Sequence, residues 1–197
     1  MTWKNTPERW GPVSQGFHWL IMVLIVTIAI VGLTMDELPR TPKYFWVYTA
    51  HKSLGLTVLA LALLRLGWRL HAGAPPPVAG SPRWQERIAS VTHWMLYALL
   101  FAMPLSGWLY DSASGLRPLH WFGLAEVPKL VAPDPGLADR AHDAHELLFL
   151  VLLGLVVLHA AAALYHHVFL RDVTLQRMLP GRRRAPAPDQ DRPAHGT

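Results

Sequence analysis

The sequence contains no cysteine and few charged residues. Without cysteine, the chain cannot form disulfides, thiolate metal sites, iron–sulfur clusters or the thioether links of c-type haem. Charged residues make up 16% of the 197 residues, against roughly 25% in a typical soluble domain. Hydrophobic residues account for 52%. A chain of this length is one domain of ordinary size, but it has too little charge to cover a soluble surface.

Four long apolar stretches run over about residues 17–33, 48–70, 88–110 and 145–170. Each is close to the roughly 20 residues that cross about 30 Å of hydrocarbon. Their apolar residues lie on all sides, which favours membrane spans over amphipathic surface helices. We therefore predict an all-α integral membrane four-helix bundle over residues 1–180. A polar, disordered cytoplasmic tail is expected over residues 181–197, and a short surface helix in the long gap between about Asp111 and Asp143.

Basic residues predict the orientation of the bundle. The net charge of +5 would suggest nucleic acid as the partner of a soluble protein, but here the charges flank the spans and suit anionic lipid headgroups. Twelve of the 18 basic residues fall on one side: Lys4, Arg9, Arg65, Arg69, Arg83, Arg87, Arg171, Arg177, Arg182, Arg183, Arg184 and Arg192. The positive-inside rule makes that side, with both termini, cytoplasmic.

Histidine occurs in every predicted span, as His18, His51, His93, and the pair His145 and His159. A single histidine near a span end is often only interfacial, but one in all four spans indicates function. His145 and His159 are 14 residues apart, so they lie within about 40° of one helix face and about 21 Å apart along its axis. Ligands at two levels suit two cofactors stacked in a bundle and not a zinc site, whose ligands converge on one atom. Two b-type haems, each with an iron between two histidines, fit this pattern.

Depth in the membrane restricts the pairing of these histidines. His51 and His145 each begin a span on the outer side, so we expect them to pair. His18 lies near the inner end of the first span, and His159 lies in the inner half of the fourth. His93 is also on the inner side. Spacing alone therefore leaves His93 a rival to His18 or to His159.

Four blocks of the sequence resemble the bacterial cytochrome b561 family, up to about Arg182. They are GFHWLIMVLIV, YTAHKSLGLTVLALALLRLGWRL, THWMLYALLFAMPLSGWLY and the last block, which contains HAAAALYHH and RDVTLQRMLP. The last block is the most specific, and it is especially similar to the superoxide oxidase branch, the superoxide:ubiquinone oxidoreductases. The resemblance implies a di-haem b protein of the inner membrane. It pairs His18 with His159 at the cytoplasmic-side haem and His51 with His145 at the periplasmic-side haem, and leaves His93 without an iron.

The resemblance also implies a ubiquinone site near the end of the last helix, at His166 and His167. Arg65 is a candidate for contact with a haem propionate or the quinone, although snorkelling to the interface is the simpler interpretation. Gly55, Gly107 and Gly154 are candidates for close approach by a porphyrin or, more simply, a neighbouring helix. Superoxide is expected to be attracted by outer basic residues, which otherwise are ordinary loop charges: Arg40, Lys43, Lys52, Lys129 and Arg140.

Three functions compete at this stage. The first is an enzyme that oxidises periplasmic superoxide and reduces ubiquinone. The second is an electron-carrier cytochrome b that serves a redox partner protein such as a hydrogenase. The third is a non-redox membrane scaffold or transporter, which does not explain histidines at two depths. The short chain and the last-helix motif favour the first function.

Overall fold

The structure is a computed structural model that describes residues 3–35, 37–39, 41–78 and 80–181. Within these residues there are four long helices: α1 Pro12–Met35, α2 Phe45–Ala72, α3 Arg83–Ala113 and α4 Pro135–Val168. A short 3-10 helix, Pro42–Tyr44, precedes α2, and the strands β1 Leu119–Trp121 and β2 Ala125–Val127 lie between α3 and α4. All four long helices are long and apolar enough to cross a membrane.

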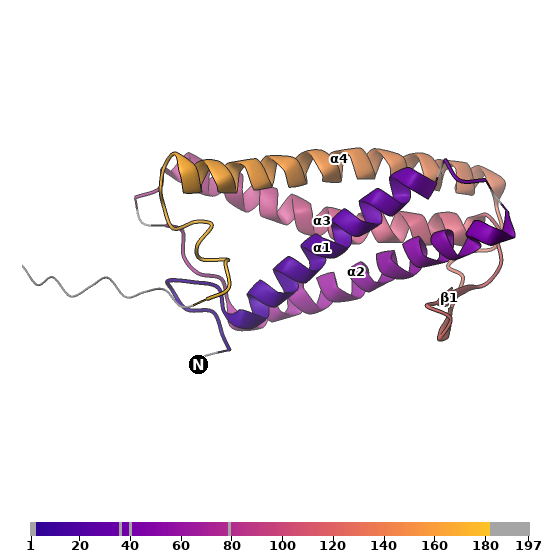
Figure 1. Ribbon diagram of the computed structural model, residues 1–197, viewed down its shortest axis with the longest axis horizontal. Coiled ribbons are helices and arrows are strands. Elements are labelled where there is room, and N and C mark those ends of the chain that lie inside the picture. Colours follow the sequence, from indigo (N-terminus) through magenta and orange to yellow (C-terminus); the bar gives the residue numbers. More distant parts are fainter. Residues whose placement is uncertain (1–2, 36, 40, 79, 182–197) are drawn as a thin grey trace, which may run out of the picture.

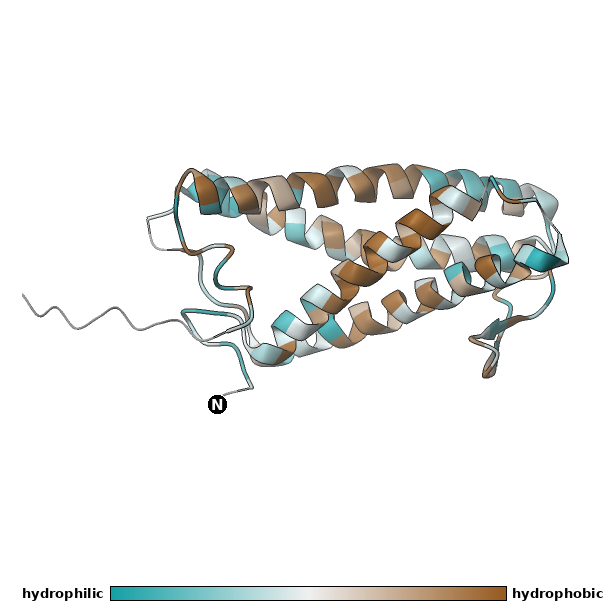
Figure 2. Cartoon of the chain, viewed as in Figure 1, coloured by the Kyte–Doolittle hydropathy of each residue, from teal (hydrophilic) through white to brown (hydrophobic). Residues whose placement is uncertain are grey.

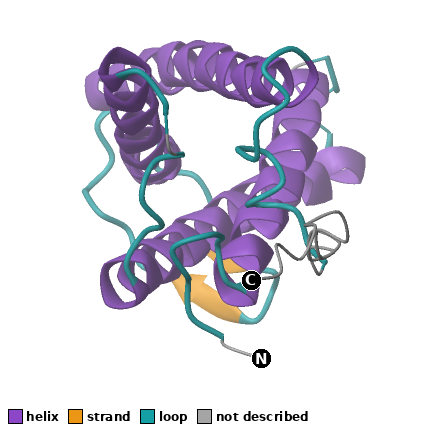
Figure 3. Cartoon of the chain, turned by 90° about the vertical axis from the view of Figure 1, so that its left-hand side faces the viewer, coloured by secondary structure: helices purple, strands orange, loops and turns teal. Residues whose placement is uncertain are grey.

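The helices form an up-and-down bundle in which α1 packs on α2, α2 on α3 and α3 on α4. Figure 1 shows the two kinds of end that this creates. We call the end where α1 and α3 begin the terminal end, because residues 3–11 and 169–181 lie there. The opposite end is the hairpin end, because it carries β1 and β2. Seen along the bundle, the four helices surround a common axis (Figure 3).

Proline and polar residues mark where the helices begin. α3 follows Pro82, and α4 has a proline in its first turn, where the missing N–H costs no hydrogen bond. The Asp134 side chain caps α4 by accepting a hydrogen bond of 3.0 Å from the backbone N–H of Leu137. α2 ends at Ala72 and is followed by Gly73, whose φ of 72° favours glycine. The helices therefore start and stop where the turn residues require.

The bundle surface is apolar along its middle. Large side chains such as Ile30, Leu63 and Leu150 are exposed, and Figure 2 shows the hydrophobic residues along the helices with hydrophilic residues towards both ends. In water this surface would be unfavourable, but it matches lipid chains. Inside, Ile21, Val58, Ala62 and Leu100 form a buried apolar cluster.

The structure differs from the sequence-based expectations after α3 and at the end of α4, and it does not describe most of the expected tail. The long gap after α3 contains an antiparallel hairpin, in which Leu119 pairs with Val127, instead of a short surface helix. The helices contain the expected apolar stretches, except that α4 ends at Val168 and not at Leu170. Of the expected tail 181–197, all but Gly181 lies outside the described residues, as does Arg40.

At the terminal end, the C-terminal segment is tied to the rest of the chain through Arg177. Its guanidinium donates hydrogen bonds to the carbonyl oxygens of Glu8 at 3.0 Å, Pro7 at 2.6 Å and Pro76 at 2.8 Å. The Trp19 indole N–H also donates to the carbonyl oxygen of Met178, at 2.9 Å. The sequence motif RDVTLQRMLP therefore joins the N-terminal segment, the α2–α3 loop and the end of α4.

Candidate functional site

Each long helix carries three positions, seven residues apart, that share one helix face. Residues seven apart are rotated by about 20° less than two full helical turns, so they lie on nearly the same face of the helix. Residues 14 apart are separated by about 21 Å along the helix axis. The positions form three layers across the bundle, defined as follows. The terminal-end layer is His18, Arg65, His93 and His159; the middle layer is Ile25, Val58, Leu100 and Leu152; the hairpin-end layer is Gly32, His51, Gly107 and His145. Val58, Leu100 and Leu152 are buried, so these faces point into the bundle.

His51 and His145 form the hairpin-end pair, with ring centres 6.3 Å apart and planes at 71°. The Nδ1 atom of His145 lies 3.1 Å from the carbonyl oxygen of Met103 and 3.0 Å from the Ser106 hydroxyl. That hydroxyl itself donates to the Met103 carbonyl, at 2.8 Å. Because the carbonyl can only accept, Nδ1 carries the proton. Nε2 is then left with a lone pair, as in histidines that bind metals.

Two glycines lie against this pair. A Cβ atom placed on Gly32 would be 3.1 Å from Cε1 of His51, and one on Gly107 would be 3.0 Å from Cε1 of His145. Side-chain carbons normally stay farther apart, so glycine is what allows these imidazoles to lie so close to the neighbouring helices. By contrast, a Cβ on Gly55 or Gly154 would meet no atom within 4 Å.

His18 and His159 form the terminal-end pair, with ring centres 6.2 Å apart and planes at 72°. His93 lies closer to His159, with ring centres 5.2 Å apart, and its Nδ1 atom is 2.6 Å from the carbonyl oxygen of Ala89. Nη2 of Arg65 lies 3.1 Å from Nδ1 of His18. Three histidines and an arginine from four helices therefore meet at one level.

The ring separations provide a test of whether a haem iron fits. A metal held between two imidazole nitrogens at about 2.0 Å, with each ring centre about 1.1 Å behind its nitrogen, separates the ring centres by about 6.2 Å. The hairpin-end and terminal-end pairs match this separation. The 5.2 Å between His93 and His159 is about 1 Å too short for an iron between them. The separation within each of these two pairs therefore fits a metal ion held between the two rings.

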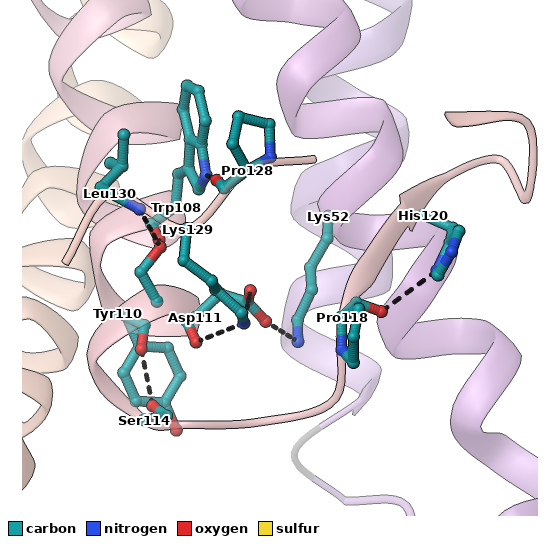
Figure 4. Close-up of polar contacts among 11 residues, drawn as sticks. Lys52, Trp108, Tyr110, Asp111, Ser114, Pro118, His120, Pro128, Lys129 and Leu130 are labelled. Carbon is teal, nitrogen blue, oxygen red and sulfur yellow. Dashed lines mark hydrogen bonds and ion pairs between the residues drawn. The ribbon is translucent and has the colours of Figure 1, made fainter. Parts of the chain in front are cut away.

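At the hairpin end, a buried carboxylate binds two lysines (Figure 4). Asp111 is 2% exposed, and its carboxylate oxygens lie 2.7 Å from Nζ of Lys52 and 2.8 Å from Nζ of Lys129. The loop after β2 is held here as well, because the Trp108 indole donates to the carbonyl oxygen of Pro128 at 3.0 Å. The cluster Lys52–Asp111–Lys129 has a net charge of +1. Its lysines, expected from the sequence to attract superoxide, are already ion-paired.

At the terminal end, His166 pairs with Asp172, with Nδ1 2.5 Å from the carboxylate oxygen. Partial burial would raise the pKa of Asp172, but hydrogen bonds from His166 and Thr174 outweigh it, so the pKa lies below its ordinary value. Asp172 is therefore charged at neutral pH and orients the His166 ring. The neighbouring His167 is exposed at the end of α4. The two residues expected to face a quinone thus have different surroundings.

Comparison with known proteins identifies the family. The model of the prokaryotic cytochrome b561 family matches residues 9–181. The chain belongs to this family. A relative from Escherichia coli, "Cytochrome b561 homolog 2", is 35% identical over 91% of this chain and 95% of its own length. "Probable superoxide oxidase CybB" of Yersinia pestis is 33% identical over 89% and 98%, and "Cytochrome b561 homolog 1" of Escherichia coli is 30% identical over 89% and 99%.

Membership of the prokaryotic cytochrome b561 family confirms the predicted fold class and the redox interpretation. Members are membrane-embedded helical bundles that bind b haem and transfer electrons. A non-redox scaffold or transporter is therefore set aside. In this cytochrome, sequence reasoning missed Gly32, Met103 and Ser106 around the hairpin-end pair. Gly32 lies 14 residues after His18, as His159 does after His145, so the spacing could have revealed it. Met103 acts through its backbone, which leaves no signal in the sequence.

Proposed function

We propose that this cytochrome binds two b haems, one at the hairpin-end pair and one at the terminal-end pair. The observation that carries the proposal is the separation of 6.3 and 6.2 Å between the paired rings, at two levels 14 residues apart on α4. His51 and His145 would hold one iron, and His18 and His159 would hold the other. When bound, haem b supplies a one-electron ferric/ferrous couple. An iron held by two histidines in this way would have no position left to bind oxygen.

The protein contributes spacing, orientation and exclusion of water. Val58, Leu100 and Leu152 form a buried apolar layer between the two pairs, which keeps water out of the space between them. The hydrogen bond from Nδ1 of His145 to the carbonyl oxygen of Met103 sets the tautomer and the ring orientation. In this proposal the two histidine pairs form two electron sites in series across the membrane.

We further propose that the reaction is superoxide oxidation coupled to ubiquinone reduction. Two superoxide anions each lose one electron and leave as oxygen, and the two electrons with two protons convert ubiquinone to ubiquinol. Two observations support it: the 33% identity to a relative named as a probable superoxide oxidase, and the resemblance in the last sequence block. The prokaryotic family supports a bacterial inner membrane, and the distribution of basic residues supports an orientation with both termini cytoplasmic. Superoxide would then arrive at the hairpin end, in the periplasm.

The ubiquinone site is proposed at the terminal end, beside His166. Asp172 accepts the hydrogen bond from Nδ1 of His166, which leaves Nε2 to exchange a proton with a quinone oxygen. His167, one residue further along, is the second candidate contact. Arg65 remains a candidate for a haem propionate or the quinone, because its guanidinium lies inside the terminal-end layer. The cytoplasmic location would supply the two protons that ubiquinol formation requires.

A second function is favoured by the hairpin-end charges. Asp111 neutralises one of the two lysines that would otherwise attract an anion. That arrangement suits an electron carrier that receives electrons from a redox partner protein at the hairpin end. In both functions the electrons reach the quinone pool through the same two histidine pairs.

Rapid mixing of the oxidised protein with superoxide distinguishes the two functions. We expect reduction of haem b, followed in its α-band, much faster than superoxide disproportionates on its own, and matched by oxygen release. His51→Ala is the control, because it removes one ligand of the hairpin-end pair and should leave one haem and slow reduction. Reduction no faster in the wild type than in this variant would exclude the enzyme and favour the carrier. A wild-type content other than two haems per chain would contradict the di-haem proposal.

A further inference from the structure

Arg65 carries a positive charge within the terminal-end layer. It lies on α2, 14 residues after His51, and its guanidinium is 3.1 Å from Nδ1 of His18 and 5.6 Å from the centre of the Tyr97 ring. Arg69 follows one helical turn later. Its guanidinium lies 5.5–5.6 Å from the ring centres of Trp10, Trp94 and Tyr97. Two cations are thus held by aromatic rings and a histidine.

Neither arginine has a carboxylate partner in the part of the chain that the structure describes. The ion pairs among residues 3–35, 37–39, 41–78 and 80–181 do not include Arg65 or Arg69. An unpaired charge inside a membrane span is costly, so such residues usually serve a function. Arg65 reaches into the bundle towards His18, not away from it.

The hairpin-end layer is different. Its positions besides the histidines are glycines, Gly32 and Gly107. The nearby cation Lys52 is ion-paired with Asp111 at 2.7 Å. The two ends of the bundle therefore differ in electrostatic potential, with more uncompensated positive charge around the terminal-end pair.

We infer that Arg65, assisted by Arg69, raises the reduction potential of the terminal-end haem above that of the hairpin-end haem. This inference rests on the proposed binding of two haems. Reduction adds one electron to the iron, and a nearby cation stabilises that electron more strongly where water is excluded. Transfer of one electron from the hairpin-end site to the terminal-end site would then be favourable and would require no proton. The charge on α2 thereby sets the direction of electron flow.

The hydrogen bond between Arg65 and His18 could act on the reduction potential in the opposite direction to the charge of Arg65. The guanidinium can only donate, so Nδ1 of His18 is the acceptor in this contact. A neutral histidine that binds iron through Nε2 carries its proton on Nδ1, so haem binding would end the contact while leaving the charge in place. If the contact instead persisted, His18 would be an electron-rich ligand and Arg65 would lower the potential. The two cases predict opposite signs.

Redox titration of the full-length protein in lipid nanodiscs tests the sign. His51→Ala leaves the terminal-end haem alone, and His18→Ala leaves the hairpin-end haem alone, so each potential can be measured separately. In the His51→Ala background, Arg65→Gln is expected to weaken electron binding about tenfold, which is 59 mV for one electron. Arg65→Lys, which keeps the charge, should remain near the starting value. In the His18→Ala background, Arg65→Gln should change nothing.

Each outcome has a distinct meaning. An unchanged or raised terminal-end potential in Arg65→Gln would overturn the inference, as would an equal fall at both haems. If Arg65→Gln does not retain the terminal-end haem, Arg69→Gln takes its place and should lower that potential by less. A rise or no change there would overturn the inference equally. Fewer than two haems in the wild type would overturn the proposed function as well, whereas two haems with potentials insensitive to both arginines would overturn only the inference.

Discussion

Replacement of Gly107 by alanine should weaken haem binding at the hairpin-end pair. The new Cβ would lie 3.0 Å from Cε1 and 3.3 Å from Nδ1 of His145, closer than carbon atoms pack in protein interiors. Both contacts come from the α3 side, so the ring must move away from α3 to relieve them. The imidazole is therefore displaced from the position in which it faces His51.

The magnitude follows from what that movement breaks. Restoring an ordinary contact requires a shift of about 0.4 Å, which stretches the Nδ1 distances to the Met103 carbonyl oxygen and the Ser106 hydroxyl, now 3.1 and 3.0 Å, towards the limit of hydrogen bonding. A weakened hydrogen bond costs about 1 kcal/mol, and overpacking costs about 1–3 kcal/mol. Alanine returns about 0.5–1 kcal/mol through its higher helix propensity. The net cost is about 1–3 kcal/mol, or roughly 5- to 150-fold in haem affinity.

Haem content of the purified variant, with the α-band resolved by redox titration, measures this effect. We expect loss of haem at the hairpin-end pair and full occupancy at the terminal-end pair. Gly154→Ala is the matched control, because it is also a helical glycine but its Cβ would meet nothing within 4 Å. If Gly107→Ala retained both haems as tightly as Gly154→Ala, the close packing of α3 against His145 could not be a determinant of the site.

Two further substitutions test the ends of the bundle. His166→Ala should keep both haems but slow quinone reduction, measured by mixing the reduced protein with a soluble ubiquinone analogue; unchanged kinetics would place the quinone elsewhere. Asp111→Asn should lower the free energy of unfolding by about 1–3 kcal/mol, because it leaves two lysines without their buried counter-charge. Thermal unfolding would measure this, with Glu146→Gln as a control, since that side chain is 63% exposed and its loss should cost less than about 1 kcal/mol.

The long helices could be predicted because their signal is local. A stretch of about 20 apolar residues between turn-forming prolines predicts a helix that spans the membrane. The hairpin could not be predicted, since β1 and β2 have three residues each and are held by tertiary contacts. The Trp121 indole donates to the Thr57 hydroxyl at 3.1 Å, and the backbone N–H of Phe122 donates to the Ser53 hydroxyl at 3.0 Å. These contacts join the hairpin to α2 residues that are 64 and 69 positions away in the sequence, so the local sequence of the hairpin does not predict them.

The rise and rotation of a helix predicted the two levels of the candidate site but not how the histidines pair. They placed His93 beside His18 and His159 without separating them, because rise and rotation along one helix say nothing about the distance across the bundle. That distance depends on how closely the helices pack, and it is 5.2 Å for His93 and 6.2 Å for His18, measured to the ring of His159. This difference of about 1 Å is the reason that we propose His18, and not His93, as the partner of His159.

The helix α3 contributes to the candidate site although a list of the proposed ligands would leave it out. α3 provides none of the four proposed ligands, yet one of its turns surrounds His145. Within this turn, Met103 contributes a carbonyl oxygen, Ser106 a hydroxyl and Gly107 the absence of a side chain. Pro104 lies in the same turn, where it has no N–H to donate within the helix. None of these acts here through a metal-binding side chain, but together they determine the tautomer and position of a proposed ligand. The turn Met103–Gly107 therefore belongs to the proposed haem site together with the histidine that it holds.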